Sequence, residues 1–75
     1  MKNLSQLSLN EKAVIYKILT LGDMRRRFLD IGLIENTEVE CVGISPAGNP
    51  KAFLIRGAVI AIRNEDSADI LITEV

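Results

Sequence analysis

Apolar residues alternate with polar ones through most of the chain, which is the pattern of half-buried β-strands. In the clearest case Glu38 and Glu40 alternate with Val39 and Cys41. Branched aliphatic residues, which fit a pleated sheet, dominate the other candidate segments. We therefore expect five short strands, over residues 12–19, 38–43, 51–56, 58–63 and 70–75. In the first of them, Val14, Tyr16 and Ile18 are expected to share one face.

One segment between the first two strands follows helical spacing instead. Met24, Phe28 and Ile31 stand at i, i+4 and i+7, so a helix would carry them as one apolar stripe. Asp23 can accept hydrogen bonds from the first unpaired amides of that helix. Gly32 stands where a left-handed residue ends a helix. The sequence thus predicts one short helix after the first strand.

Turn residues separate these elements. Asn10-Glu11, the 45–50 segment and Gly57 are expected to reverse the chain, and residues 64–69 to form a turn or one helical turn. The opening segment, with Leu4 and Leu7 among polar residues, fits a short cap on a core. Residues 1–75 are long enough for one domain only. The predicted fold class is therefore mainly β: a single, strongly bent barrel of about five strands with one short helix.

The charge and composition of the chain argue against a nucleic-acid partner and favour a location in the cytosol. Nine basic residues against ten acidic ones give a net charge of −1, so the global basic field typical of nucleic-acid binders is absent. A single cysteine suits a reducing cytosol. The longest apolar run, residues 58–62, is too short to cross a bilayer, and the N-terminus lacks the apolar region of a signal peptide. We expect a cytoplasmic protein with no direct membrane insertion.

The side chains needed for catalysis are scarce. The chain has no histidine, which is the commonest general base and transition-metal ligand. Cys41 lies on the Val39 face of its strand and is expected to be a buried hydrophobe, with a thiol ligand or redox sensor as the alternative. The carboxylates of residues 65, 66 and 69 lack the spacing of a calcium loop and fit a solvated turn. We expect no enzyme activity, no catalytic or metal site and no cofactor.

Three consecutive arginines, Arg25, Arg26 and Arg27, begin the predicted helix, where the helix dipole favours anions. They could form a solvated helix face, balanced by pairs from Asp23 to Arg27 and from Asp30 to Arg26 or Arg27. Alternatively they face an anion, because arginine suits bidentate contacts with carboxylate or phosphate. An acidic protein surface is favoured over a nucleic-acid backbone or a lipid head group. Arg63 is a secondary candidate for the same role.

Four segments, in order, resemble a known family. They are the arginine-rich helix with its Gly32-Leu33 ending, the 45–50 loop, the aliphatic strand ending in Arg63 before an acidic turn, and the last strand at 68–72. Together they resemble ferrous iron transport protein A, the FeoA family, over essentially the whole chain. Asn10-Glu11 and Glu35-Asn36 replace glycine-containing turns that are common in that family.

The resemblance implies an SH3-like barrel that acts in the cytosol beside FeoB, the membrane ferrous iron transporter with a GTPase domain. The small protein would bind the cytosolic part of FeoB and support its assembly or activity, without carrying the metal. Two alternatives remain: a small barrel that binds nucleic acid through the same arginines, and a repressor-type SH3-like module that regulates transcription. Edge strands could also pair weakly between two copies of the chain.

Overall fold

The computed structural model describes residues 1–74, so the final position of the last predicted strand, Val75, lies outside the described residues. In chain order the elements are η1 (Leu4–Gln6), β1 (Lys12–Ile18), α1 (Gly22–Asp30), β2 (Glu38–Ile44), β3 (Lys51–Ile55), β4 (Ala58–Ile62), α2 (Asn64–Ser67) and β5 (Ile70–Glu74). The predicted mainly β class, with a helix after the first strand, is confirmed. The 3-10 helix η1 and the short helix α2 occupy the segments expected to be a cap and a turn.

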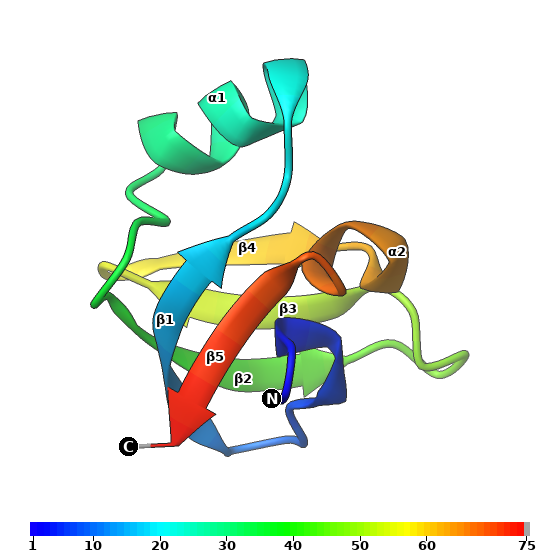
Figure 1. Ribbon diagram of the computed structural model, residues 1–75. Coiled ribbons are helices and arrows are strands. Elements are labelled where there is room, and N and C mark those ends of the chain that lie inside the picture. Colours follow the sequence, from blue (N-terminus) through cyan, green and yellow to red (C-terminus); the bar gives the residue numbers. More distant parts are fainter. Residues whose placement is uncertain (75) are drawn as a thin grey trace.

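The strands form a single antiparallel sheet in the order β4-β3-β2-β1-β5. Figure 1 shows the sheet bending sharply, so that β1 and β5 cross over β2, β3 and β4. Two irregularities in register accompany this bend, one between Ile15 and Lys17 in β1 and one between Cys41 and Gly43 in β2. Such bulges add a residue to one strand and increase its local twist. The bend brings both halves of the sheet around one core.

The prediction that Val14, Tyr16 and Ile18 share one face of β1 is wrong. Its buried side chains are Ala13, Ile15 and Ile18, whereas Tyr16 is 52% exposed. The register against β5 shifts between Ile15 and Lys17, so the inward face passes from odd to even positions along the strand. Strict alternation cannot represent that shift. In β2 the expected alternation holds, since Val39 and Cys41 are buried.

The core is aliphatic with two phenylalanines, Phe28 from α1 and Phe53 from β3. Leu4 and Leu7 beside η1 are buried against it, which confirms the predicted cap, while Leu9 is half exposed. Lys51 on β3 reinforces the cap. Its Nζ donates to the carbonyl oxygens of Ser5 and Leu7, at 2.6 and 3.1 Å.

Helix α1 ends as predicted and begins differently. Gly32 has φ +89°, its amide donates to the Leu29 carbonyl at 3.0 Å, and the Leu33 amide donates to the Phe28 carbonyl at 2.8 Å. This pair of bonds is the Schellman ending that a left-handed glycine permits. The predicted Asp23 cap is wrong, because the residue at the cap position is Leu21, which makes no side-chain cap bond. Asp23 instead lies in the first turn, where its charge suits the helix dipole.

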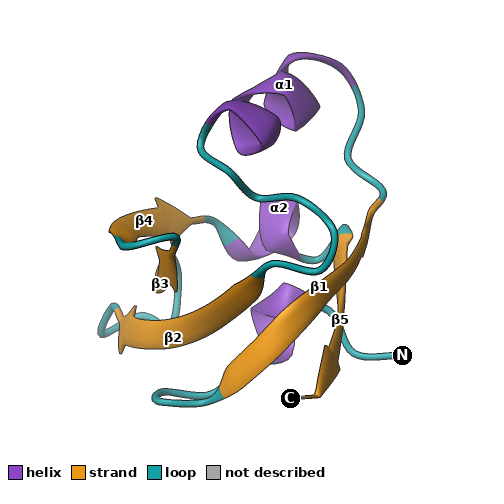
Figure 2. Ribbon diagram, turned by 90° about the vertical axis from the view of Figure 1, so that its left-hand side faces the viewer, coloured by secondary structure: helices purple, strands orange, loops and turns teal. Residues whose placement is uncertain are grey.

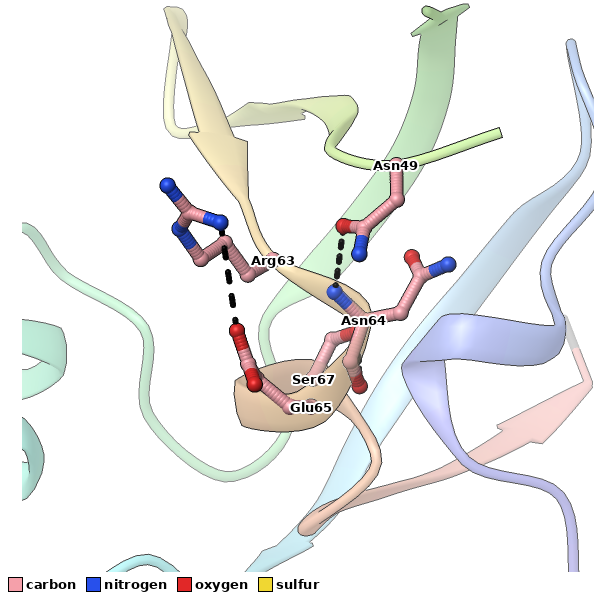
Figure 3. Close-up of polar contacts among 5 residues, drawn as sticks. All are labelled: Asn49, Arg63, Asn64, Glu65 and Ser67. Carbon is pink, nitrogen blue, oxygen red and sulfur yellow. Dashed lines mark hydrogen bonds and ion pairs between the residues drawn. The ribbon is translucent and has the colours of Figure 1, made fainter. Parts of the chain in front are cut away.

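The predicted turns at Asn10 and Gly57 are also present. Asn10 has φ +69°, and the two residues joining β3 to β4, Arg56 and Gly57, have φ +50° and +84°. Two left-handed residues make the type of tight turn that matches the twist of a β-hairpin. The 45–50 loop is tied to α2, because the Asn49 side chain accepts from the Asn64 amide at 3.0 Å (Figure 3).

Candidate partner-binding groove

A groove runs between helix α1 and strand β4, with a volume of about 340 Å³. Figure 1 shows α1 above β4, on the side of that strand away from β3. Figure 2 shows the same helix from the side, reached from the end of β1 by one loop and leading back to β2 by another. The groove is lined by apolar residues of α1 and β4 and by three charged residues: Met24, Arg27, Phe28, Ile31, Ile60, Ala61, Ile62, Arg63 and Asp66. We call it the α1–β4 groove.

Two of the four arginines predicted to bind a partner meet in this groove. Arg27 reaches it from α1, and Arg63 directly follows β4, although the two residues are far apart in the sequence. Both side chains are exposed. The fold therefore brings together two cations that the sequence could only treat as separate candidates.

Arg25 has a different environment. Its guanidinium donates to the carbonyl oxygen of Ile18 at 2.9 Å and is half-buried. Ile18 is the last residue of β1, so this bond ties α1 to the end of the strand before it. Arg25 thus has a structural contact, and Arg26 is exposed on the helix surface without lining the groove.

The expected ion pairs on α1 are not formed. Among residues 1–74 the structure contains one ion pair, between Arg63 and Glu65, with a nitrogen–oxygen distance of 4.0 Å (Figure 3). Both side chains are 70% exposed. A pair this long and this exposed contributes little to stability, because water screens it and both side chains stay mobile. Arg27 and Arg63 can therefore reorient toward an approaching carboxylate at small cost.

The surface around α1 is unusually apolar. Large aliphatic side chains that are at least a third exposed occur in α1 and the loops that flank it: Leu19, Leu21, Leu29, Ile31 and Ile34. Leu21 is 82% exposed. This surface was not predicted from the sequence, although a signal was present, since one short helix cannot bury so many aliphatic residues on a single stripe. Of these, Ile31 lines the α1–β4 groove, whereas Leu29 and Ile34 line a separate hollow beside Arg25.

Elsewhere in residues 1–74 there are few side chains that could bind a metal or react. Cys41 is fully buried, with Sγ 3.7 Å from the Gly43 carbonyl oxygen, which confirms the small buried hydrophobe. Residues 1–74 contain no group of three or more histidine, cysteine, aspartate or glutamate side chains arranged to hold a metal ion. No helix in that range is long and apolar enough to span a membrane.

A second hollow, of about 460 Å³, lies near the start of β1 and the end of β5. Its charged lining residues have mixed signs, with Lys2 and Lys12 beside Glu11 and Glu74. The hydrogen bond that Glu11 accepts from the Ser8 amide, at 2.7 Å, lowers the pKa of the Glu11 carboxyl. Its two lysines and two glutamates balance in charge, and no arginine lines it.

Comparison with known proteins places this fold in a family. A family model described as the FeoA domain matches residues 2–74. A relative from Porphyromonas gingivalis, an Fe(2+) transport protein A/Fe(2+) transporter FeoB fusion protein, is 30% identical over 67 residues. That match covers 89% of this chain but only 8% of the fusion protein.

Solved structures show the same fold. The FeoA protein of Chlorobium tepidum superposes with a TM-score of 0.93 at 22% identity, covering 99% of this chain and 70% of that one. The zinc-complexed FeoA of Stenotrophomonas maltophilia, described as a procaryotic SH3 domain protein, has a TM-score of 0.85 at 23% identity, covering 97% and 91%. Because the family model matches nearly the whole length of this chain, the chain belongs to the FeoA family of ferrous iron transport and has that family's SH3-like fold.

Proposed function

We propose that this protein acts in the cytosol by binding the cytosolic part of the GTPase-transporter FeoB, and that it supports the transporter's assembly or activity. The observation that carries the proposal is the α1–β4 groove, which combines an apolar lining with Arg27 and Arg63. Interfaces gain most of their affinity from a few buried apolar or arginine contacts of this kind.

The fusion relative supports the choice of partner. In the Porphyromonas gingivalis protein, by its name, Fe(2+) transport protein A and FeoB are parts of one polypeptide. Joining two modules in one chain raises their effective concentration, which is useful when the modules must touch. The α1–β4 groove supplies a surface suited to such a contact.

The groove also fits an adaptable protein contact. Met24 and Ile60 are only partly buried and pack against the core, so a partner could cover them without unfolding the domain. Methionine adjusts its shape to a partner at low cost. The guanidinium groups of Arg27 and Arg63 can bind carboxylates in bidentate fashion at the margins of that apolar contact.

Titration of the purified cytosolic region of FeoB from the same organism tests the proposal. We expect the wild-type protein to bind and the double variant Arg27→Ala/Arg63→Ala to bind at least about tenfold more weakly, the loss expected for two interfacial arginines. Lys17→Ala is the matched control, since Lys17 is an exposed cation on β1 outside the groove. Absence of binding by the wild type, or equal binding by wild type and double variant, contradicts the proposal.

A further inference from the structure

The two edge strands of the sheet differ in how far other parts of the chain cover them. The outer edge of β5 is partly covered by the N-terminal segment, because Asn3 bridges to Leu71 and the Ile72 amide donates to the Lys2 carbonyl at 3.0 Å. The outer edge of β4 has no neighbouring strand in the sheet order. Exposed edges are normally blunted with charges or covered, since their unpaired groups bind other strands. All five residues of β4, Ala58–Ile62, are uncharged and apolar.

The register of the β3–β4 hairpin fixes which groups point outward. Ile55 pairs with Ala58 around the two-residue turn, and Phe53 pairs with Ile60. In a two-residue hairpin the pair that closes the turn exchanges hydrogen bonds, and bonded pairs then alternate along the ladder. The N–H and C=O groups of Val59 and Ala61 therefore face away from β3. No turn, loop or cap hydrogen bond of the described residues uses them.

The outward groups of β4 open onto the α1–β4 groove. Ala61 lines the groove, and its small side chain leaves room for a chain to approach the backbone. Val59 is 64% exposed. Five residues of strand span roughly 17 Å, enough for two pairs of backbone hydrogen bonds with an added strand. Apolar residues of α1 on the far side of the groove would then cover one face of that strand.

The charged residues of the α1–β4 groove indicate which kind of strand would bind at the edge of β4. The lining contains two arginines and one carboxylate, Asp66, and Arg63 already pairs with Glu65 at 4.0 Å, so Arg27 is the cation of the groove that no ion pair of residues 1–74 uses. A second copy of β4 is a poorer occupant. Antiparallel pairing of two β4 strands centred on Ile60 would place Arg63 opposite Gly57 of the second copy, beside that copy's Arg56. That strand also brings no carboxylate to Arg27, because all five residues of β4 are apolar.

We propose that the edge of β4 binds an extended segment of the partner as a sixth strand, with apolar side chains at alternate positions and a carboxylate that meets Arg27 or Arg63. This rests on the proposed function and specifies how FeoB is held: by main-chain hydrogen bonds to Val59 and Ala61 inside the α1–β4 groove. Addition of a strand to an open edge is a recurrent mode of peptide recognition, in which the backbone supplies affinity and the side-chain pockets supply specificity.

Amide hydrogen exchange by NMR, with and without the cytosolic region of FeoB, tests the proposal. In the free protein we expect the amides of Val59 and Ala61 to exchange quickly and that of Ile60 to be protected. On binding, exchange at Val59 and Ala61 should slow at least about tenfold. Ala61→Pro removes one outward N–H without breaking a β3–β4 bond, as proline permits in edge strands, and should weaken binding at least about tenfold. Ala61→Ser keeps the N–H and should bind within about twofold of wild type.

The outcomes separate the two proposals. If FeoB binds while the Val59 and Ala61 amides stay unprotected, the strand-addition proposal is overturned and the proposed function stands. If the wild type does not bind FeoB at all, both are overturned. Protection at Val59 and Ala61 in a dimer of this chain alone would also overturn the proposal, because the edge would then belong to a second copy. Should Ala61→Pro fail to fold, the protection of the two wild-type amides decides.

Discussion

Gly32 shows how one residue links helix α1 to the β3–β4 hairpin. Its φ of +89° allows the helix to end, and a Cβ atom at this position would lie 2.6 Å from Cδ of Arg56. That separation is shorter than a van der Waals contact, so the Arg56 side chain would have to move. Glycine is therefore favoured here by its backbone conformation, whereas the exposed and flexible Arg56 side chain can move aside at small cost.

Gly32→Ala is predicted to lower the free energy of unfolding by about 1–2 kcal/mol, the cost of a left-handed alanine, with little added by displacing the exposed Arg56 side chain. Gly48→Ala is the matched control, because Gly48 also has a positive φ, +82°, but has open space around its Cβ position. Urea denaturation of both variants measures the difference. We expect similar losses, and a much larger loss for Gly32→Ala than for Gly48→Ala would contradict the small cost assigned to moving Arg56.

Arg25 and Arg26 are neighbours with different expected roles. Arg25→Ala removes the hydrogen bond to the Ile18 carbonyl and should cost about 1 kcal/mol of unfolding free energy. Arg26→Ala should change it by less than about 0.5 kcal/mol, as is usual for an exposed site. Thermal unfolding of both variants checks this, and equal stabilities would contradict the structural role of Arg25.

At the scale of secondary structure, the sequence predicts those features that depend on residues close together in the chain. Alternation located the strands and the buried Cys41, and helical spacing with Gly32 located α1 and its ending. The inward face of β1 was missed because the bulge near Tyr16 depends on pairing with β5, which is distant in the sequence. The cap of α1 was missed because polar propensity points to Asp23, whereas the chain enters the helix at Leu21.

The candidate site was predictable only in part, for the same reason. Arginine chemistry singled out Arg27 and Arg63, but a sequence pattern cannot show that residues 24–31 and 60–66 form one groove. Nor can it separate Arg25 from its neighbours, because the Ile18 carbonyl is brought to it by the loop between β1 and α1. The open edge of β4 likewise depends on the strand order of the whole sheet.

On the scale of the whole molecule, charge and apolar surface are unevenly distributed. The net charge is only −1, yet the α1–β4 groove has an excess of arginine, and exposed aliphatic side chains concentrate around α1. The hollow beside β5 has balanced charges. A near-neutral protein whose groove combines apolar side chains with arginines is suited to a specific protein contact rather than to general attraction by a polyanion.

We propose that the α1–β4 groove is the surface that contacts FeoB. Chemical-shift mapping of the isotope-labelled protein during titration with the FeoB cytosolic region measures this directly. We predict that the largest shifts fall at Met24, Arg27 and residues 60–63, with little change around Lys2 and Glu74. Shifts concentrated in the hollow beside β5, or no shifts at saturating partner, would contradict the account.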